Sequence, residues 1–166
     1  MLRFDNVILL VSGIPATGKS TFAKYLVQKY NFTHFDLEQP YQAWPDPDLH
    51  AIWDQSRSEF VKHLRSRYKR VVLDWGFPQS CLSWVQELQS QDVHVVWFTG
   101  NISQARKAFI ARSGSDSAIN FDNQVSDISS MSLPESLNCT VIPALSNDGV
   151  FLSGEAAVRL IFDLKG

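Results

Sequence analysis

The chain has 166 residues, of which 45% are apolar and 12% aromatic. This is enough for one domain with its own hydrophobic core, and it argues against a chain that is disordered or depends on disulfides for its stability. Fifteen lysines and arginines against 17 aspartates and glutamates give a formal charge of −2, so no overall positive field favours long nucleic acid or an anionic membrane. Cys81 and Cys139 lack metal-ligand or redox-motif spacing and are expected to be free thiols. The apolar run 7–11 is too short for a signal sequence or membrane span, so we expect a soluble cytoplasmic protein.

Apolar runs of strand length alternate with helical patterns along the chain. Strands are expected at residues 7–11, 32–37, 70–73, 93–98 and 140–145. Helices are expected at residues 20–30, 47–68, 80–90, 102–112 and 153–164. Because parallel strands need crossover helices, this alternation predicts an α/β fold, namely a three-layer, doubly wound, mainly parallel five-stranded sheet in one domain, residues 1–166. Pro143 places the last strand at an edge of that sheet.

Two segments lack this regularity. Residues 38–48 contain three prolines and two large aromatic side chains, and we interpret residues 38–68 as an insertion on the acceptor side. Residues 113–132 are rich in Ser, Asp and Asn with few hydrophobic residues, which indicates a mobile, lid-like flap. Since ligands of doubly wound sheets bind beyond the carboxyl ends of the strands, both segments would flank such a site.

The strongest motif is a complete G-x-x-x-x-G-K-[ST] phosphate loop between the first strand and the first helix. Its residues are Gly13, Ile14, Pro15, Ala16, Thr17, Gly18, Lys19, Ser20 and Thr21. The two glycines let successive backbone N–H groups turn inward and form an anion nest at a helix N-terminus. Lys19 is expected to bridge the β- and γ-phosphates of ATP, and the Ser20 hydroxyl to ligate Mg²⁺.

A carboxylate follows the third strand, at the end of the run Val71-Val72-Leu73-Asp74. This is the pattern of a Walker B aspartate, which holds the Mg²⁺ shell, usually through water. The alternative is an aspartate that only turns the chain. The metal role is favoured because the loops after the first and third strands are expected to lie side by side.

Three segments, GIPATGKSTFAKYL, FDLE and VVLDWGF, together resemble the small P-loop kinases of the adenylate-kinase-like, zeta-toxin and polynucleotide-kinase group. The resemblance is strongest over residues 7–77. It implies a nucleoside-monophosphate-kinase-like fold, the phosphate loop as the cradle of the donor, and Asp36 as the general base. A carboxylate that faces the γ-phosphate across the strand ends can orient a hydroxyl, with Glu38 as the weaker substitute.

The resemblance also makes Arg106 and Arg112 candidates for the lid arginines that neutralise the transferred phosphoryl group. Both lie in the C-terminal half of a helix, where the helix dipole stabilises cations in any case. Arg112 is favoured because it directly precedes the flap in the sequence, although no Arg or Lys follows it before Arg159. Catalysis is therefore less strongly indicated than nucleotide binding.

The acceptor side is rich in aromatic residues that could stack a sugar, a base or an aromatic ring. We expect substrate contacts from Tyr41, Trp44, Trp75 and from Arg57, whose guanidinium could clamp a phosphate or carboxylate. Each of these side chains could instead be part of the core or a solvated face. The basic run 62–70 is explained more simply by its place at a helix C-terminus than by nucleic-acid binding.

No base-specificity motif of the N/T-K-x-D type, no DxxG at Asp74 and no LSGGQ-like signature is present, which argues against regulatory GTPases and transporter ATPases. The favoured function is an ATP- and Mg²⁺-dependent phosphotransferase that acts on a hydroxyl of a small molecule. A polynucleotide 5′-hydroxyl kinase and a noncatalytic ATP-binding regulatory module are the alternatives.

Overall fold

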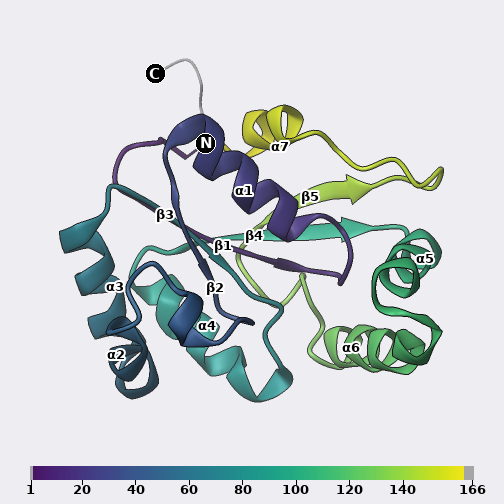
Figure 1. Ribbon diagram of the computed structural model, residues 1–166, viewed down its shortest axis with the longest axis horizontal. Helices are drawn as coiled ribbons and strands as arrows, with labels where there is room; N and C mark the ends of the chain where they lie inside the picture. Colours follow the sequence, from purple (N-terminus) through teal and green to yellow (C-terminus); the bar gives the residue numbers. More distant parts are fainter. Residues whose placement is uncertain (1, 163–166) are drawn as a thin grey trace.

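The computed structural model describes residues 2–162, which form five parallel strands with helices on both faces of one sheet (Figure 1). The strand order is β2-β3-β1-β4-β5. The strands are β1 (Val7–Gly13), β2 (Thr33–Asp36), β3 (Arg70–Asp74), β4 (His94–Gly100) and β5 (Thr140–Leu145). The predicted α/β, doubly wound fold is therefore confirmed, and β5, which contains Pro143, lies at an edge.

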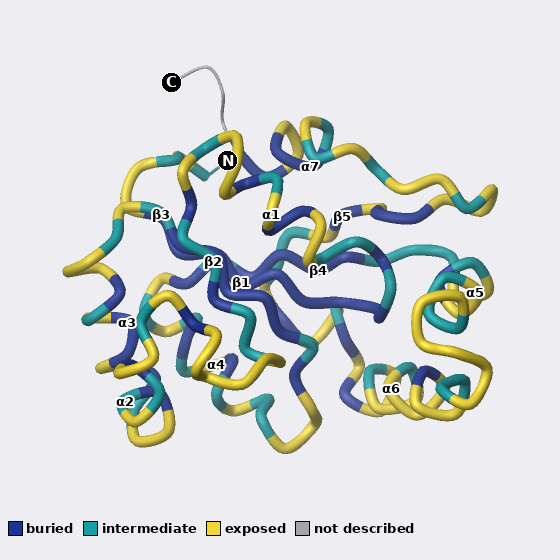
Figure 2. Tube along the Cα trace, viewed as in Figure 1, coloured by how far each residue is buried: buried dark blue, intermediate teal, exposed yellow. Residues whose placement is uncertain are grey.

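The sheet has two helical layers, which follow from the alternation of side chains along each strand. Helices α1 (Lys19–Tyr30) and α7 (Gly154–Ile161) cover one face, packing on Leu9, Val11 and their neighbours. Helices α2 (Leu49–Gln55), α3 (Arg57–Arg67) and α4 (Leu82–Ser90) cover the other, packing on Ile8 and Leu10. The central strands are buried on both faces, whereas the helices expose their outer sides (Figure 2).

The register places the carboxyl ends of three strands side by side. Val11 of β1 pairs with Asp74 of β3, and Asp74 in turn pairs with Asp36 of β2. On the other side of β1, Gly13 pairs with Phe98 of β4. The phosphate loop and two acidic residues from different parts of the sequence therefore meet at one edge of the sheet.

The segment 113–132, expected to be an irregular, lid-like flap, is largely helical. It contains a short 3-10 turn (Ser115–Ser117) and α6 (Ala118–Ser130), which packs beside α5 (Ile102–Ser113) at the end of the molecule that carries the strand ends (Figure 1). Phe121 is fully buried there, with Val125 packed partly against the same cluster. Phe121, Val125 and Ile128 have helical spacing, a signal that the polar composition masks.

The single helix expected over residues 47–68 is two helices, α2 and α3. The break is at Ser56, whose backbone is extended and whose hydroxyl accepts a hydrogen bond from the Glu59 N–H at 3.1 Å. A serine in this position is a strong helix start signal. The terminal helix starts at the expected cap, Ser153, but ends at Ile161, and Leu164 lies outside the described residues.

Cys81 and Cys139 are free thiols, as expected. Among residues 2–162, no helix has the length and apolar character needed to cross a membrane.

Candidate active site

The phosphate loop connects the end of β1 to the start of α1. Gly13 and Gly18 have φ values of +135° and +93°, which glycine adopts without strain. A Cβ on Gly13 would lie 2.2 Å from the carbonyl oxygen of Phe98, so the close approach of β1 to β4 also requires glycine here. The Ile14 N–H donates to that same carbonyl at 3.0 Å, which fixes the entry to the loop.

Two side chains of the loop bond to its own backbone. The Thr17 hydroxyl donates to the Ile14 carbonyl at 2.7 Å, and Lys19 Nζ donates to the same oxygen at 2.9 Å. Burial lowers the pKa of Lys19, while the carboxylates of Glu38 and Asp74 act in the opposite direction. Lys19 is thus held at the mouth of the loop with two carboxylates nearby.

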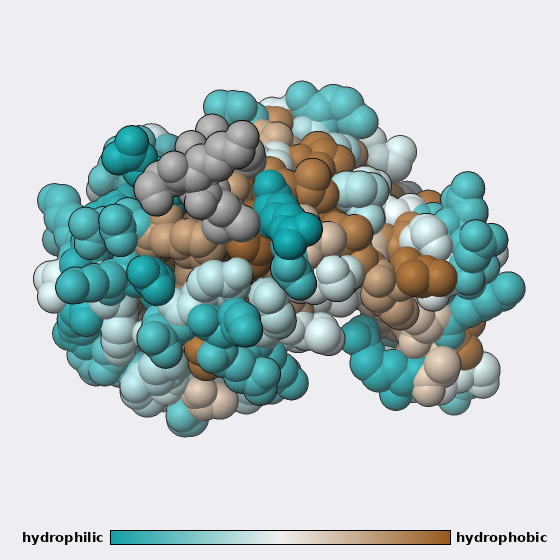
Figure 3. All heavy atoms as spheres, turned by 90° about the horizontal axis from the view of Figure 1, so that it is seen from above, coloured by the Kyte–Doolittle hydropathy of each residue, from teal (hydrophilic) through white to brown (hydrophobic). Residues whose placement is uncertain are grey.

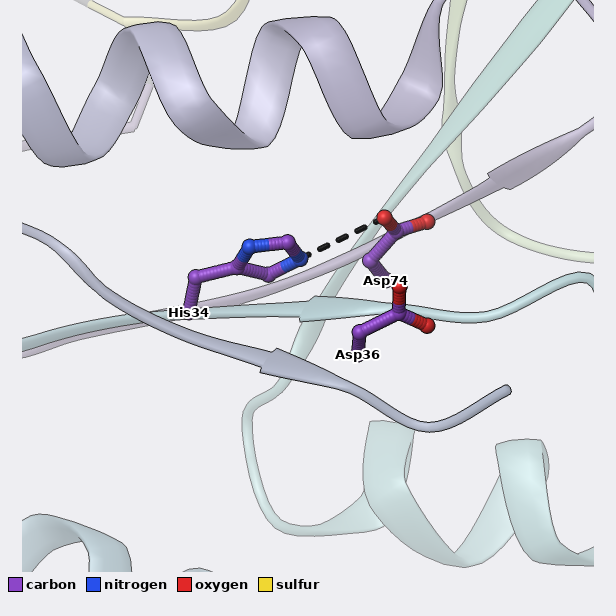
Figure 4. Close-up of side chains that lie close together, drawn as sticks. All are labelled: His34, Asp36 and Asp74. Carbon is purple, nitrogen blue, oxygen red and sulfur yellow. Dashed lines mark hydrogen bonds and ion pairs between the residues drawn. The ribbon is translucent and has the colours of Figure 1, made fainter. Parts of the chain in front are cut away.

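Ser20 and Asp74 join the loop to β3. The Ser20 hydroxyl donates to Asp74 Oδ2 at 2.7 Å, and His34 Nε2 lies 3.3 Å from the same oxygen (Figure 4). Asp74 is almost fully buried. A hydroxyl and a carboxylate are oxygen ligands of the kind that Mg²⁺ prefers, so this donor set fits the ion that the fold implies.

Two carboxylates lie at the end of β2, with Asp36 as its last residue and Glu38 just after it, and they differ in position. Glu38 lines the cleft over the phosphate loop, where its Oε1 accepts a hydrogen bond from the Gly76 N–H at 2.8 Å. Burial raises the pKa of Glu38, and the Gly76 N–H and Lys19 partly offset this rise. Asp36 is not among the residues that line this cleft, and it lies beside Asp74 (Figure 4). Burial and the Asp74 carboxylate raise the pKa of Asp36.

The cleft has a volume of about 280 Å³ and is bounded by the phosphate loop, Glu38, Asp74, Gly76 and the facing helices α5 and α6. A cavity of about 470 Å³ adjoins it, between the start of α1 and the loop before α7, and is largely apolar. Its lining includes Phe22, Tyr25, Phe98 and Phe151. On the face that Figure 3 shows, apolar side chains lie in the middle and toward the right, and the lower edge of the outline is notched.

Of the two candidate lid arginines, the structure brings only Arg112 to the loop. Arg112 lines both the cleft and the larger cavity, and its guanidinium lies 5.5 Å from the centre of the Phe109 ring. Arg106 forms an ion pair with Asp122 of α6 at 2.9 Å and lines neither space. Arg106 therefore ties α6 to α5 instead of facing the phosphate loop.

Of the four side chains expected to contact an acceptor, three pack in the core or are held by neighbouring groups, and Tyr41 is exposed. Trp44 and Trp75 are only 6% and 7% exposed and belong to the core below the sheet. The Arg57 guanidinium bonds to the carbonyls of Trp53 and Asp54, pairs with Glu87 at 2.9 Å and stacks on Trp84. Tyr41 is exposed and stacks on His50, with ring centres 4.2 Å apart. None of these four residues lines the cleft.

A smaller pocket that the sequence did not reveal continues from the cleft. It has a volume of about 120 Å³, and shares Gly13, Gly76 and Gln124 with the cleft. The apolar part of its lining is formed by Phe77, Trp97, Ile128, Met131 and Leu133, and the polar part includes Gln124 and Asp127. Helix α6 provides one wall, so the pocket depends on an element whose polar composition predicts an irregular flap.

Comparison with known proteins gives one sequence relative and many structural neighbours. No protein-family model matches the sequence. The cytidylate kinase of Fusobacterium nucleatum subsp. nucleatum is 25% identical over 123 residues, which are 74% of this chain. The chain spans about half, 53%, of the length of that relative.

Solved structures share the fold over most of the chain. The gluconokinase from Sinorhizobium meliloti 1021 has a TM-score of 0.59 at 14% identity, covering 96% of this chain and 90% of its own. The tunicamycin resistance protein of Deinococcus radiodurans has a TM-score of 0.60 at 14% identity, covering 93% of each chain. A shikimate kinase from Bacteroides thetaiotaomicron has a TM-score of 0.52 at 14% identity, covering 83% of this chain and 86% of its own.

These likenesses establish the fold. The chain is a small P-loop protein with the fold of the nucleoside-monophosphate-kinase type, and its resemblance to small P-loop kinases, predicted from three short segments, is confirmed.

Proposed function

We propose that the protein is an ATP-dependent phosphotransferase that moves the γ-phosphate of MgATP to a hydroxyl group of a small-molecule acceptor. The observation that carries the proposal is the cleft itself, where Lys19, the Ser20–Asp74 hydrogen bond and Glu38 surround one space of about 280 Å³. The names of two structural neighbours, a gluconokinase and a shikimate kinase, support a small acceptor.

The donor would bind with its phosphates on backbone N–H groups of the phosphate loop, to which every residue from Gly13 to Thr21 except Pro15 can contribute, and its base in the adjoining apolar cavity. Ser20 and Asp74 would hold Mg²⁺, which when bound neutralises charge on the β- and γ-phosphates. Lys19 and Arg112 provide the positive charge on the two sides of the cleft. Such preorganised charge is the main source of catalysis in phosphoryl transfer.

In the transfer step, the acceptor oxygen forms a bond to the γ-phosphorus while the bond from that phosphorus to the β–γ bridging oxygen breaks and ADP leaves. The acceptor proton passes to a carboxylate and then to water. Glu38 is the better placed base, because it lines the same cleft as Lys19, whereas Asp36 does not line the cleft and lies beside Asp74. The raised pKa of Glu38 suits a group that must accept a proton.

The acceptor would enter the pocket of about 120 Å³ between α6 and the loop that holds Phe77. This space suits a small polyol or a similar compound, with Gln124 and Asp127 as hydrogen-bonding groups at its edge. In the polynucleotide-kinase alternative, the basic run 62–70 would hold the strand. Its arginines are engaged elsewhere: Arg65 bonds to the carbonyls of Asn6 and Gln91, and Arg67 pairs with Asp46 and Asp48.

The first test is ATP binding by calorimetry, with Lys19→Ala compared with Lys24→Ala, an exposed lysine on the same helix. Lys19→Ala should weaken ATP binding at least tenfold and Lys24→Ala should not; equal affinities would contradict the assignment of the cradle. The second test measures ADP formation with sugars, polyols, nucleosides and 5′-hydroxyl oligonucleotides. Stimulation by a small hydroxyl compound supports the proposal, stimulation by oligonucleotides alone favours the end kinase, and tight ATP binding without any turnover favours the noncatalytic module.

A further inference from the structure

Three side chains of types that can ligate metals, His34, Asp36 and Asp74, converge on β2 and β3. His34 and Asp36 are two residues apart on β2 and so face the same side of the sheet, and Asp36 pairs in register with Asp74 of β3. One ligand atom from each of the three residues lies within 4.8 Å of the other two (Figure 4). The sequence alone does not indicate this cluster, because no pair of the four histidines has metal-ligand spacing along the chain.

This cluster holds two carboxylates and one imidazole, and the nearby cation whose charge acts on Asp74 is Lys19 of the phosphate loop. The Asp74 side chain is 2% exposed and that of His34 is 17% exposed, so water screens the group weakly. Within residues 2–162, no lysine or arginine forms an ion pair with Asp36 or Asp74. Two adjacent carboxylates in such surroundings repel each other, and a bound cation would relieve this repulsion.

We propose that His34, Asp36 and Asp74 form a binding site for a divalent transition metal ion that is occupied without nucleotide. Imidazole nitrogen is a ligand that Zn²⁺, Co²⁺ and Mn²⁺ accept, whereas Mg²⁺ prefers oxygen ligands and keeps its waters. Ligand atoms on one such ion lie about 3 to 4 Å apart, given bond lengths of about 2.1 Å. Small side-chain rotations would bring the three atoms from their present spacing to that range.

The site shares Asp74 with the expected Mg²⁺ site, but it adds a nitrogen ligand that the phosphate loop does not provide. Its consequence is a preference among metals: Zn²⁺ or Co²⁺ should bind tightly to the free protein, and Mg²⁺ weakly. The proposal does not rest on phosphoryl transfer, because it concerns binding by the nucleotide-free protein.

The test titrates Zn²⁺, Co²⁺ and Mg²⁺ into the nucleotide-free full chain by calorimetry, with Co²⁺ absorption as a second signal. We expect one equivalent of Zn²⁺ or Co²⁺ to bind at least tenfold more tightly than Mg²⁺, and His34→Gln to lose this preference. The matched control is His50→Gln, since His50 Nε2 lies 3.6 Å from Asp54 Oδ2 on α2 and, among residues 2–162, His50 belongs to no cluster of three metal-ligating side chains. The control should bind the ions like the unmodified protein.

Equal binding of Zn²⁺ and Mg²⁺ by the unmodified protein, or Zn²⁺ binding that His34→Gln leaves unchanged, would overturn the proposal. If His34→Gln does not fold, the proposal is decided by comparing the Zn²⁺ and Mg²⁺ affinities of the unmodified protein. Pulsed electron paramagnetic resonance of the Mn²⁺-loaded protein with ¹⁵N-labelled histidine should show coupling to one imidazole nitrogen, and no such coupling would contradict a histidine ligand.

Discussion

Replacing Gly13 by alanine tests how the phosphate loop depends on the close approach of two strands. The new Cβ would lie 2.2 Å from the Phe98 carbonyl oxygen and 2.6 Å from the Phe98 nitrogen. Both are backbone atoms of the adjacent strand, so no side-chain rotation can relieve the contact. The residue would also have to keep a φ of +135°, which L-residues rarely adopt.

The expected cost has two parts. Holding alanine at a positive φ costs about 1–3 kcal/mol, and forcing an extra methyl group into a packed space costs about 1–3 kcal/mol more. The variant Gly114→Ala distinguishes the backbone cost from the packing cost, because Gly114 has a φ of +91° but a Cβ added there would meet no other part of the chain within 4 Å. Gly114→Ala should therefore show only the first part, and Gly13→Ala both.

Urea unfolding followed by tryptophan fluorescence measures the difference. With a denaturant slope of about 2 kcal/mol/M, an additional loss of about 2 kcal/mol lowers the unfolding midpoint by about 1 M relative to Gly114→Ala. Gly13→Ala should also lose ATP binding, since β1 and β4 must separate. Equal midpoints for the two variants would refute the reasoning from the close approach of the strands.

Arg57→Met should lower the free energy of unfolding by about 1–3 kcal/mol, because the guanidinium bonds to two carbonyls and to Glu87. ATP affinity should stay unchanged, and a selective loss of acceptor turnover would instead support a substrate-binding role for Arg57. Arg106→Gln should speed amide hydrogen exchange in α6 and leave exchange in the sheet unchanged, and unchanged exchange in α6 would contradict a tethering role. Burial and a hydrogen bond to Asp46 raise the pKa of Tyr68 to about 12. Because the folded pKa exceeds the usual value of 10, the contribution of this tyrosine to stability is present below pH 10 and lost as pH rises toward 12. Tyr68→Phe should remove the component of the tyrosine absorbance titration that ionises at the highest pH. An unaltered titration would exclude the raised pKa of Tyr68.

The fold and the phosphate loop could be predicted because their signals are local. Five apolar runs, each followed by a helical pattern, define the sheet. The nine residues Gly13 to Thr21 contain the whole loop motif, and the strand before it and the helix after it are both recognisable in the sequence. Asp74 could be placed for the same reason, since it ends a strand that is recognisable by itself.

What could not be predicted depends on register and packing between distant elements. Trp44 is of a residue type that often stacks on ligands, but its indole N–H donates to the Asp36 carbonyl and its ring is buried in the core. His34 lies beside Asp74 only because β2 and β3 pair in one register, and Glu38 reaches the cleft through its bond to Gly76. No sequence spacing records these contacts.

If the cleft transfers a phosphoryl group, Glu38 is the residue that accepts the proton of the acceptor hydroxyl. The most direct measurement follows label from γ-labelled ATP into the panel of hydroxyl compounds, with the unmodified protein and Glu38→Gln in parallel and ATP affinity measured for both. We expect label on a small-molecule hydroxyl and a fall of about 100-fold or more in the labelling rate for Glu38→Gln, at similar ATP affinity. Labelling at the same rate by both proteins, or tight ATP binding with no labelled product, would contradict this expectation.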